Sequence, residues 1–340
     1  MSPLRIVGSA APPERPDDVI VALRKALHAG ELELPLPGRG DTARRWSGLC
    51  EHGRRDLSLA RLVEGHADAV AILHEAGNKP EPNALYGVWA SRASGKGAVL
   101  RGTGTNTVLT GTVPFCSGAD VLDRAVIAAR PEDARDAAED VLIEIPLPDP
   151  RVRALPDTWN AGGMAASRTR DVELTDIPVG ENERIGAPGF YTARPGFHLG
   201  GAGVAAVWLG GAAGVHDRVL DHLVRREPDE HQLAHLAAMH LGLVASDSTL
   251  AGAAADVDAP RTDFDPADVA AVCRSTVERA ACEVLALAPR ITGPGPLSRD
   301  VAFAQRLSDL EVYVRQHHGE RELAELGGKL VRASRTGVRP

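Results

Sequence analysis

The sequence lacks the features that mark several common classes of protein. It has four cysteines and no C-x-x-C pair, so it predicts neither a zinc site nor a disulfide framework and fits a reducing, cytoplasmic setting. It has no Lys/Arg-rich run and a formal net charge of −8, which argues against a nucleic-acid partner. Walker A, G-x-S-x-G and H-E-x-x-H motifs are also missing, so we expect no P-loop, α/β-hydrolase or metal-centre chemistry.

Membrane signals are scarce as well. The first residues, MSPLRIVGSAAPPERPDD, contain no apolar h-region of the kind found in signal peptides. The longest apolar candidate, Leu199 to Val215, is rich in Gly and Ala and amphipathic, and no uninterrupted apolar run reaches the length of a bilayer. We therefore expect a protein that does not insert into a membrane.

What is present indicates an α+β protein with three parts in chain order. At 340 residues, with 44% hydrophobic and 25% charged residues, the chain is long enough for two or three compact substructures. Residues 1–80 are expected to form a short helical domain, with helices at 17–29 and 55–76 and a Pro/Gly-rich connector, LPLPGRGD, between them.

The middle part, 81–190, is dominated by short β-prone runs separated by turns, such as AVLRG, TNTVLTGTV and DVLIEIPL. We predict a mostly antiparallel β-domain there. The last part, 191–340, returns to helical periodicity, and four long helices are expected to form an antiparallel bundle. The last of these helices is predicted from about Arg299 to Gly327.

Four local strings occur in a fixed order along these parts. The first is Tyr86-Gly-Val-Trp-Ala90, and the second is Leu109-Thr-Gly-Thr-Val-Pro-Phe-Cys-Ser-Gly-Ala119. The third joins Trp159-Asn-Ala-Gly-Gly-Met164 to Asp171-Val-Glu-Leu-Thr-Asp-Ile-Pro-Val179, and the fourth holds Arg225 and Arg226 before His231-Gln232-Leu233. Together with the order of the parts, they resemble the acyl-CoA dehydrogenase family, in which helices, a β-domain and a four-helix domain clamp FAD and an acyl-CoA thioester.

The resemblance implies roles for particular residues. Phe115 and Ser117 match positions that give the flavin ring an aromatic wall and a hydroxyl near its electron-rich edge, and Trp89 is expected beside the ring. Trp89 and Ala90 replace a Thr-Glu pair of the family. Arg225 or Arg226 would hold the FAD pyrophosphate of a neighbouring subunit, because a guanidinium fork suits paired phosphate oxygens. The third string supports the fold rather than the chemistry.

The stretch VYVRQHHGERELAELG raises the question of a catalytic base. The family's glutamate is expected eight residues after an aspartate here matched to Asp309, and that position holds His317. An imidazole titrates near neutral pH, so His317 is a candidate base, with Glu320 as a second candidate one turn further on. The alternative interpretation is a polar helix face whose side chains pair with neighbours three or four residues away.

The leading functional hypothesis is therefore an FAD-dependent, acyl-CoA dehydrogenase-like enzyme that desaturates an acyl thioester and passes electrons to an electron-transfer flavoprotein. One alternative is a flavin monooxygenase of the same fold, supplied by a separate flavin reductase. Another is a non-catalytic homologue that acts as an oligomeric scaffold. In each case, exposed apolar surface on the bundle and the arginine offered to a neighbour predict a homo-oligomer.

Overall fold

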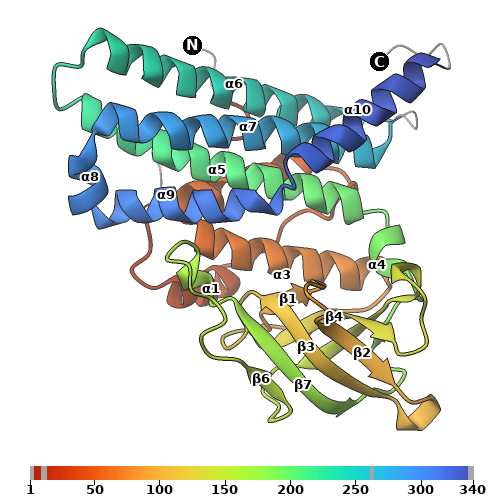
Figure 1. Cartoon of the computed structure of the whole chain (residues 1–340). Helices are drawn as coiled ribbons and strands as arrows, with labels where there is room; N and C mark the ends of the chain where they lie inside the picture. Colours follow the sequence, from red (N-terminus) through yellow and green to blue (C-terminus); the bar gives the residue numbers. More distant parts are fainter. Residues whose placement is uncertain (1–3, 9–13, 261–263, 336–340) are drawn as a thin grey trace. The chain divides into compact units, whose positions relative to one another are not determined.

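The computed structural model describes residues 4–8, 14–260 and 264–335, which contacts group into two compact units (Figure 1). The first, here called the helical unit, comprises Met1–Arg15, Pro35–Ala60 and His198–Pro340. The second, the sheet unit, comprises Pro16–Leu34 and Arg61–Phe197. Residues 1–80 are thus divided between both units.

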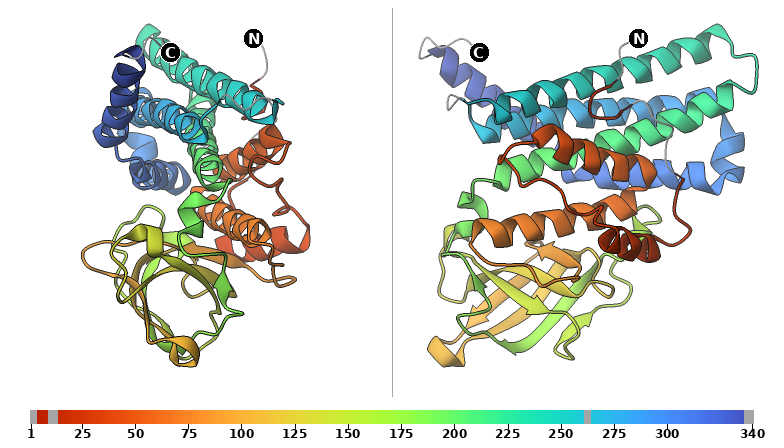
Figure 2. Two further views of the ribbon diagram at one scale, coloured as in Figure 1. Left: turned by 90° about the vertical axis from the view of Figure 1, so that its right-hand side faces the viewer. Right: turned by 180° about the vertical axis from the view of Figure 1, so that it is seen from behind.

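The sheet unit is built on one eight-stranded sheet in the order β6-β7-β3-β2-β4-β5-β8, with β1 paired to β4. Two pairings are parallel, β1 with β4 and β2 with β4, and the other pairings are antiparallel. The left view of Figure 2 shows that this sheet curls round on itself. The strands are β1 (Tyr86–Trp89), β2 (Gly97–Arg101), β3 (Val108–Cys116), β4 (Arg124–Pro131), β5 (Val141–Pro146), β6 (Val152–Ala154), β7 (Arg170–Pro178) and β8 (Arg184–Ile185).

Helix α3 (Leu57–Glu75) supplies the apolar cover of this sheet from its sheet-unit portion. Ile72 and Leu73 of α3 pack in one buried cluster with Val126 of β4 and Leu142 of β5. Each such side chain contributes about 1.5–3 kcal/mol when it is fully buried. The two short helices of this unit are α1 (Val19–His28), whose N-terminus is capped by Asp18, and α4 (Phe190–Ala193).

The helical unit contains the long helices expected at the end of the chain. Helix α5 lies among the others in Figures 1 and 2, and most of its residues are buried. It is long and apolar enough to cross a membrane, but 83% of its most apolar window is buried in the protein, as in the core helix of a globular unit. The helices are α2 (Thr42–Arg55), α5 (Phe197–Leu223), α6 (Glu230–Asp258), α7 (Pro266–Thr292), α8 (Pro294–Arg299), α9 (Val301–Tyr313) and α10 (Glu320–Arg335).

Two expectations about helices were wrong. Helix α2 was missed, because TARRWSGLCEHGRR is rich in Arg and Gly and only one narrow face, with Trp46 and Leu49, is apolar and buried. The last predicted helix, 299–327, is interrupted: α9 ends at Tyr313, a short 3₁₀ turn follows at Val314–Gln316, and α10 begins at Glu320. The mixed helix and strand fold class itself is confirmed.

The crossing of α2 and α5 depends on glycine. A Cβ added at Gly210 would lie 2.0 Å from the carbonyl oxygen of Cys50, and one added at Gly53 would lie 2.3 Å from the carbonyl oxygen of Val207. Both neighbours are backbone, which cannot move aside as a flexible side chain does. The two helices therefore approach each other at a distance that only glycine permits.

Replacing Gly210 with Ala is expected to lower the free energy of unfolding by about 2–4 kcal/mol, since the methyl group overlaps the α2 backbone. Gly252→Ala in α6 is the matched control, because a Cβ there meets nothing within 4 Å. That variant should be neutral or up to about 1 kcal/mol more stable, as alanine favours helix. Urea unfolding followed by circular dichroism measures both, and equal effects of the two substitutions would contradict the close crossing.

Candidate functional site

The structure brings Trp89, Phe115 and Ser117 together in the sheet unit. Trp89 is the last residue of β1 and is buried, and its indole Nε1–H donates a hydrogen bond to the carbonyl oxygen of Ser117 at 3.1 Å. Ser117 follows directly after β3, and Phe115 is the last but one residue of that strand. The indole thus fixes the backbone at the end of β3, where the two other predicted residues stand.

The Ser117 hydroxyl is held by two donors. Arg61 Nε donates to Ser117 Oγ at 3.2 Å, and Thr169 Oγ1 donates to the same oxygen at 3.1 Å. Both contacts use the oxygen as acceptor, so among the described residues they leave the Ser117 hydrogen available to a ligand. Arg61 is in turn ion-paired with Glu64 one turn along α3. A hydroxyl positioned in this way fits an electron-rich heterocycle edge.

Phe115 has an unusual backbone for an aromatic residue. Its φ is +59°, within the left-handed region that non-glycine residues rarely adopt, and the register of β3 against β7 shifts between Val113 and Cys116. The side chain is 54% exposed even though it is a large aromatic group. Its amide donates a 3.4 Å hydrogen bond to Asp171, whose carboxylate is ion-paired with Lys96. Such strain together with exposure is typical of functional sites.

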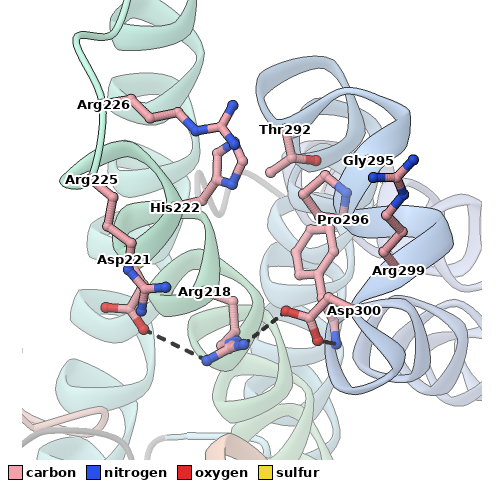
Figure 3. A pocket seen from close by; sticks show the side chains of 11 residues that line it. Arg218, Asp221, His222, Arg225, Arg226, Thr292, Gly295, Pro296, Arg299 and Asp300 are labelled. Carbon is pink, nitrogen blue, oxygen red and sulfur yellow. Dashed lines mark hydrogen bonds and ion pairs between the residues drawn. The ribbon is translucent and has the colours of Figure 1, made fainter.

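Arg225 and Arg226 line a cavity of about 560 Å³ in the helical unit, between the end of α5 and the region around α8 (Figure 3). Arg218 contributes a further guanidinium, but it is ion-paired with Asp300 at 2.8 Å and with Asp221 at 3.9 Å. The cavity is lined by Arg218, Asp221, His222, Arg225, Arg226, Thr292, Gly295, Pro296, Arg299, Asp300 and Phe303.

This cavity, here called the arginine cavity, is positively charged. Within the described part of the chain, Arg225, Arg226 and Arg299 form no ion pair, whereas both lining carboxylates are engaged by Arg218. Burial lowers the pKa of His222, and the neighbouring charges of Arg226 and Arg225 lower it further, so this imidazole is neutral at pH 7. Three guanidinium groups without an ion-pair partner around one cavity fit a ligand that carries more than one phosphate group.

His317 is placed differently from its predicted role. Its side chain is fully buried, and the ring packs edge-on against the indole of Trp208 with centroids 6.4 Å apart. The Gly319 amide donates to Nδ1 at 3.1 Å, so Nδ1 has no hydrogen and Nε2 carries it. Nε2 faces Ser275 Oγ at 3.1 Å and Glu322 Oε2 at 3.2 Å. The lone pair that a base requires is therefore already used, and the geometry favours a structural role.

The polar neighbours of His317 form a small, partly buried network. Burial tends to raise the pKa of Glu322, but hydrogen bonds and charge from Arg274 and a hydrogen bond from the His318 amide outweigh it and lower the pKa to about 2. Arg274 also lies over the Trp208 ring, 4.8 Å from its centroid. The second candidate base, Glu320, is exposed at the start of α10, and neither it nor His317 lines the arginine cavity.

Comparison with known proteins agrees with this architecture. Residues 187–319 match the family model of the acyl-CoA dehydrogenase C-terminal domain. Butyryl-CoA dehydrogenase from Megasphaera elsdenii superposes with a TM-score of 0.79 at 16% identity, covering 94% of this chain and 91% of that one. The chain has the acyl-CoA dehydrogenase fold. The predicted resemblance is confirmed at this level.

The chain is also similar to solved structures of proteins that are not named as acyl-CoA dehydrogenases. KijD3, solved in complex with FMN and a dTDP-linked amino-keto sugar, has a TM-score of 0.72 at 21% identity. The match covers 96% of this chain and 88% of the KijD3 chain. Methanesulfinate monooxygenase MsuC from Pseudomonas fluorescens has a TM-score of 0.75 at 20% identity and covers 94% and 90%. At these identities the likeness shows the fold alone. A comparison with the sequences of curated proteins gave no match.

Several residues of the candidate site were not predicted from the sequence. Arg61 and Thr169 hold Ser117, yet they lie 56 and 52 residues away from it along the chain, so no local pattern connects them. Arg299 also lines the cavity with Arg225 and Arg226, but it lies 73 residues after Arg226 in the sequence (299 − 226). A single basic residue after a Gly/Pro-rich turn gives no signal of its own.

The buried imidazole makes a testable contribution to stability. Burial lowers the folded-state pKa of His317 below the unfolded value of 6.5, although Glu322 opposes the shift. As the pH falls through 6.5, the unfolded chain therefore binds a proton at His317 more readily than the folded chain does. The contribution of the neutral, buried imidazole to the free energy of unfolding is thus present above pH 6.5 and is lost below it. His317→Asn is expected to flatten the fall in unfolding free energy between about pH 7 and pH 5, by up to about 1.4 kcal/mol per pH unit.

His318→Asn is the matched control, because the neighbouring imidazole side chain is 67% exposed. Chemical unfolding at a series of pH values gives the slopes. A wild-type slope in His317→Asn, or the same change of slope in both variants, would show that His317 is not the buried neutral group described above.

Proposed function

We propose that this chain is a flavin-dependent oxidoreductase in which Trp89, Phe115 and Ser117 form the support for the isoalloxazine ring. The observation that carries the proposal is the Ser117 hydroxyl, whose oxygen is fixed by Arg61 and Thr169 while its hydrogen stays available. It stands beside an exposed aromatic side chain on a strained backbone. A bound flavin would supply hydride acceptance or, once reduced, reaction with oxygen.

FAD is the cofactor that the arginine cavity supports best. Arg225, Arg226 and Arg299 offer three guanidinium groups with no ion pair among the described residues, more than one terminal phosphate requires. In the proposed assembly they bind the pyrophosphate of FAD held mainly by a neighbouring subunit of a cytoplasmic homo-oligomer. FMN, which is bound in KijD3, is the alternative cofactor.

Two reactions are considered for the bound flavin: desaturation of an acyl-CoA and monooxygenation of a small molecule. The positions of the two candidate bases, His317 and Glu320, favour monooxygenation. Desaturation requires a group that removes a proton beside the thioester, and the free lone pair of His317 already accepts the Gly319 amide. Glu320 is exposed in the first turn of α10. An oxygenase of this fold depends on a flavin reductase for its reduced cofactor rather than on an electron-transfer flavoprotein.

Flavin binding tests the support directly. Fluorescence titration of the purified protein with FAD should give saturable binding, and Ser117→Ala should weaken it about tenfold through the loss of one hydrogen bond. The variant Arg225→Ala/Arg226→Ala should weaken FAD binding by a larger factor and leave riboflavin, which has no phosphate, unaffected. Arg279→Ala, an exposed arginine on α7 away from the cavity, is the control. Failure of the wild-type protein to take up any flavin would favour the scaffold alternative.

A second experiment separates the reactions. We expect the protein loaded with oxidised FAD to keep its visible absorbance under anaerobic butyryl-CoA or octanoyl-CoA, because neither candidate base, His317 or Glu320, is placed to remove the proton. With chemically reduced flavin and air, the protein should change the rate of oxygen consumption relative to free flavin. Bleaching by either thioester would instead establish the dehydrogenase activity.

A further inference from the structure

One titratable side chain of the arginine cavity has no role in the proposed function: the imidazole of His222. It lies in the last turn of α5 and lines the cavity together with Arg225 and Arg226. Figure 3 shows these three side chains on one side of the cavity, with Thr292 and Arg299 on the other. Within the described part of the chain no hydrogen bond or ion pair engages the His222 ring, so both ring nitrogens are available to a ligand.

Opposing influences act on the charge of this imidazole. Burial lowers the pKa of His222, and the charges of Arg226 and Arg225 lower it further. The end of α5 acts in the other direction, because the partial negative charge of a helix C-terminus stabilises a cation in the last turn. The imidazole is therefore neutral at pH 7 as long as the two guanidinium charges beside it are not offset by an anion.

The lining carboxylates do not cancel the charge of the arginines. Asp221 and Asp300 both contact Arg218, at 3.9 and 2.8 Å. Asp300 also caps α9, because it accepts a hydrogen bond from the amide of Phe303 at 3.0 Å. With His222 neutral, the four arginines and two aspartates of the lining give a formal charge of +2 (4 − 2). This charge balances a diphosphate diester, in which each of the two phosphate groups carries one negative charge.

A bound diphosphate would reverse the conditions at His222. Its negative charges would offset those of Arg225 and Arg226, which removes their effect on the imidazole and leaves the effect of the helix end. A phosphate oxygen beside the ring also favours the charged form, since an imidazolium donates a hydrogen bond from either nitrogen. Binding of the anion and protonation of His222 therefore favour each other, and thermodynamic linkage makes this coupling reciprocal.

We propose that His222 is a fourth anion-binding residue of the arginine cavity, beside Arg225, Arg226 and Arg299, and that it takes up a proton when a diphosphate group binds. The protein then holds such a ligand more tightly as the pH falls from about 8 to about 6. The inference rests on the proposed function in one respect, since it takes the ligand of this cavity to be a diphosphate. It makes no use of the isoalloxazine support around Ser117.

Binding of ADP-ribose tests the inference without a flavin. This compound contains a diphosphate diester whose charge is constant between about pH 6 and pH 8, so a change in affinity over that range comes from the protein. Isothermal titration calorimetry should show about fivefold to tenfold tighter binding at pH 6 than at pH 8, with net uptake of a fraction of a proton at pH 7. The uptake is measured from the difference in heat between two phosphate-free buffers of different ionisation enthalpy.

Two substitutions at the same position separate charge from structure. His222→Gln should remove both the proton uptake and the pH dependence, while its affinity at pH 8 stays that of the wild type. His222→Lys, which is positively charged at both pH values, should bind at pH 8 as tightly as the wild type does at pH 6. His28→Gln is the matched control, because His28 also lies in the last turn of a helix, α1, but belongs to the sheet unit and does not line the cavity. It should change neither readout.

The outcomes distinguish this inference from the proposed function. Proton uptake that persists in His222→Gln, loss of ADP-ribose binding by that variant at pH 8, or a wild-type protein that does not bind ADP-ribose would each overturn the role of His222. Riboflavin contains no phosphate, so its binding reports on the isoalloxazine support alone. Riboflavin binding with pH-independent ADP-ribose binding would refute this inference and leave the proposed function standing. Proton-linked ADP-ribose binding without uptake of any flavin would do the reverse.

Discussion

The close approach of α2 to α5 is the contact on which the helical unit depends. Gly210 of α5 and Gly53 of α2 remove the side chains that would otherwise separate the two backbones. Arg306 of α9 then reaches the C-terminus of α2 and donates to the carbonyl oxygens of Arg54 and Arg55 at 2.8 and 3.0 Å. A positive group there satisfies carbonyls that a helix end leaves without partners. The packing of α2, α5 and α9 is thereby fixed at one place.

Helix α5 also connects that packing to both polar features of the unit. Near its middle, Trp208 lies fully buried and forms edge-to-face contacts with Tyr313 and His317. At its end, Arg225 and Arg226 lie just after the last helical residue, Leu223, and line the arginine cavity. A helix that is buried along most of its length can hold these groups at defined positions, because its own orientation is set by packing.

The sequence was informative where chemistry is local and uninformative where it is assembled from distant segments. The β-prone runs AVLRG, TNTVLTGTV and DVLIEIPL identified β2, β3 and β5, because the signal for each strand lies within a few consecutive residues. Helix α2 was missed because its stabilising feature is the partner surface of α5, which no local pattern reveals. Phe115 and Ser117 were proposed as site residues from one short string, whereas Arg61, which donates a hydrogen bond to the Ser117 hydroxyl, belongs to another element.

The interruption between α9 and α10 shows why His317 was interpreted as a base. Counted along an unbroken helix, it lies at the position expected for a proton acceptor. The 3₁₀ turn at Val314–Gln316 and the extended backbone of His317, with ψ of 129°, instead turn the ring inward against Trp208. There the Gly319 amide takes the free lone pair, and Ser275 and Glu322 face the other nitrogen. A residue's place in a count therefore gives its chemistry only when the helix that carries it continues, and in this chain the helix ends four residues earlier.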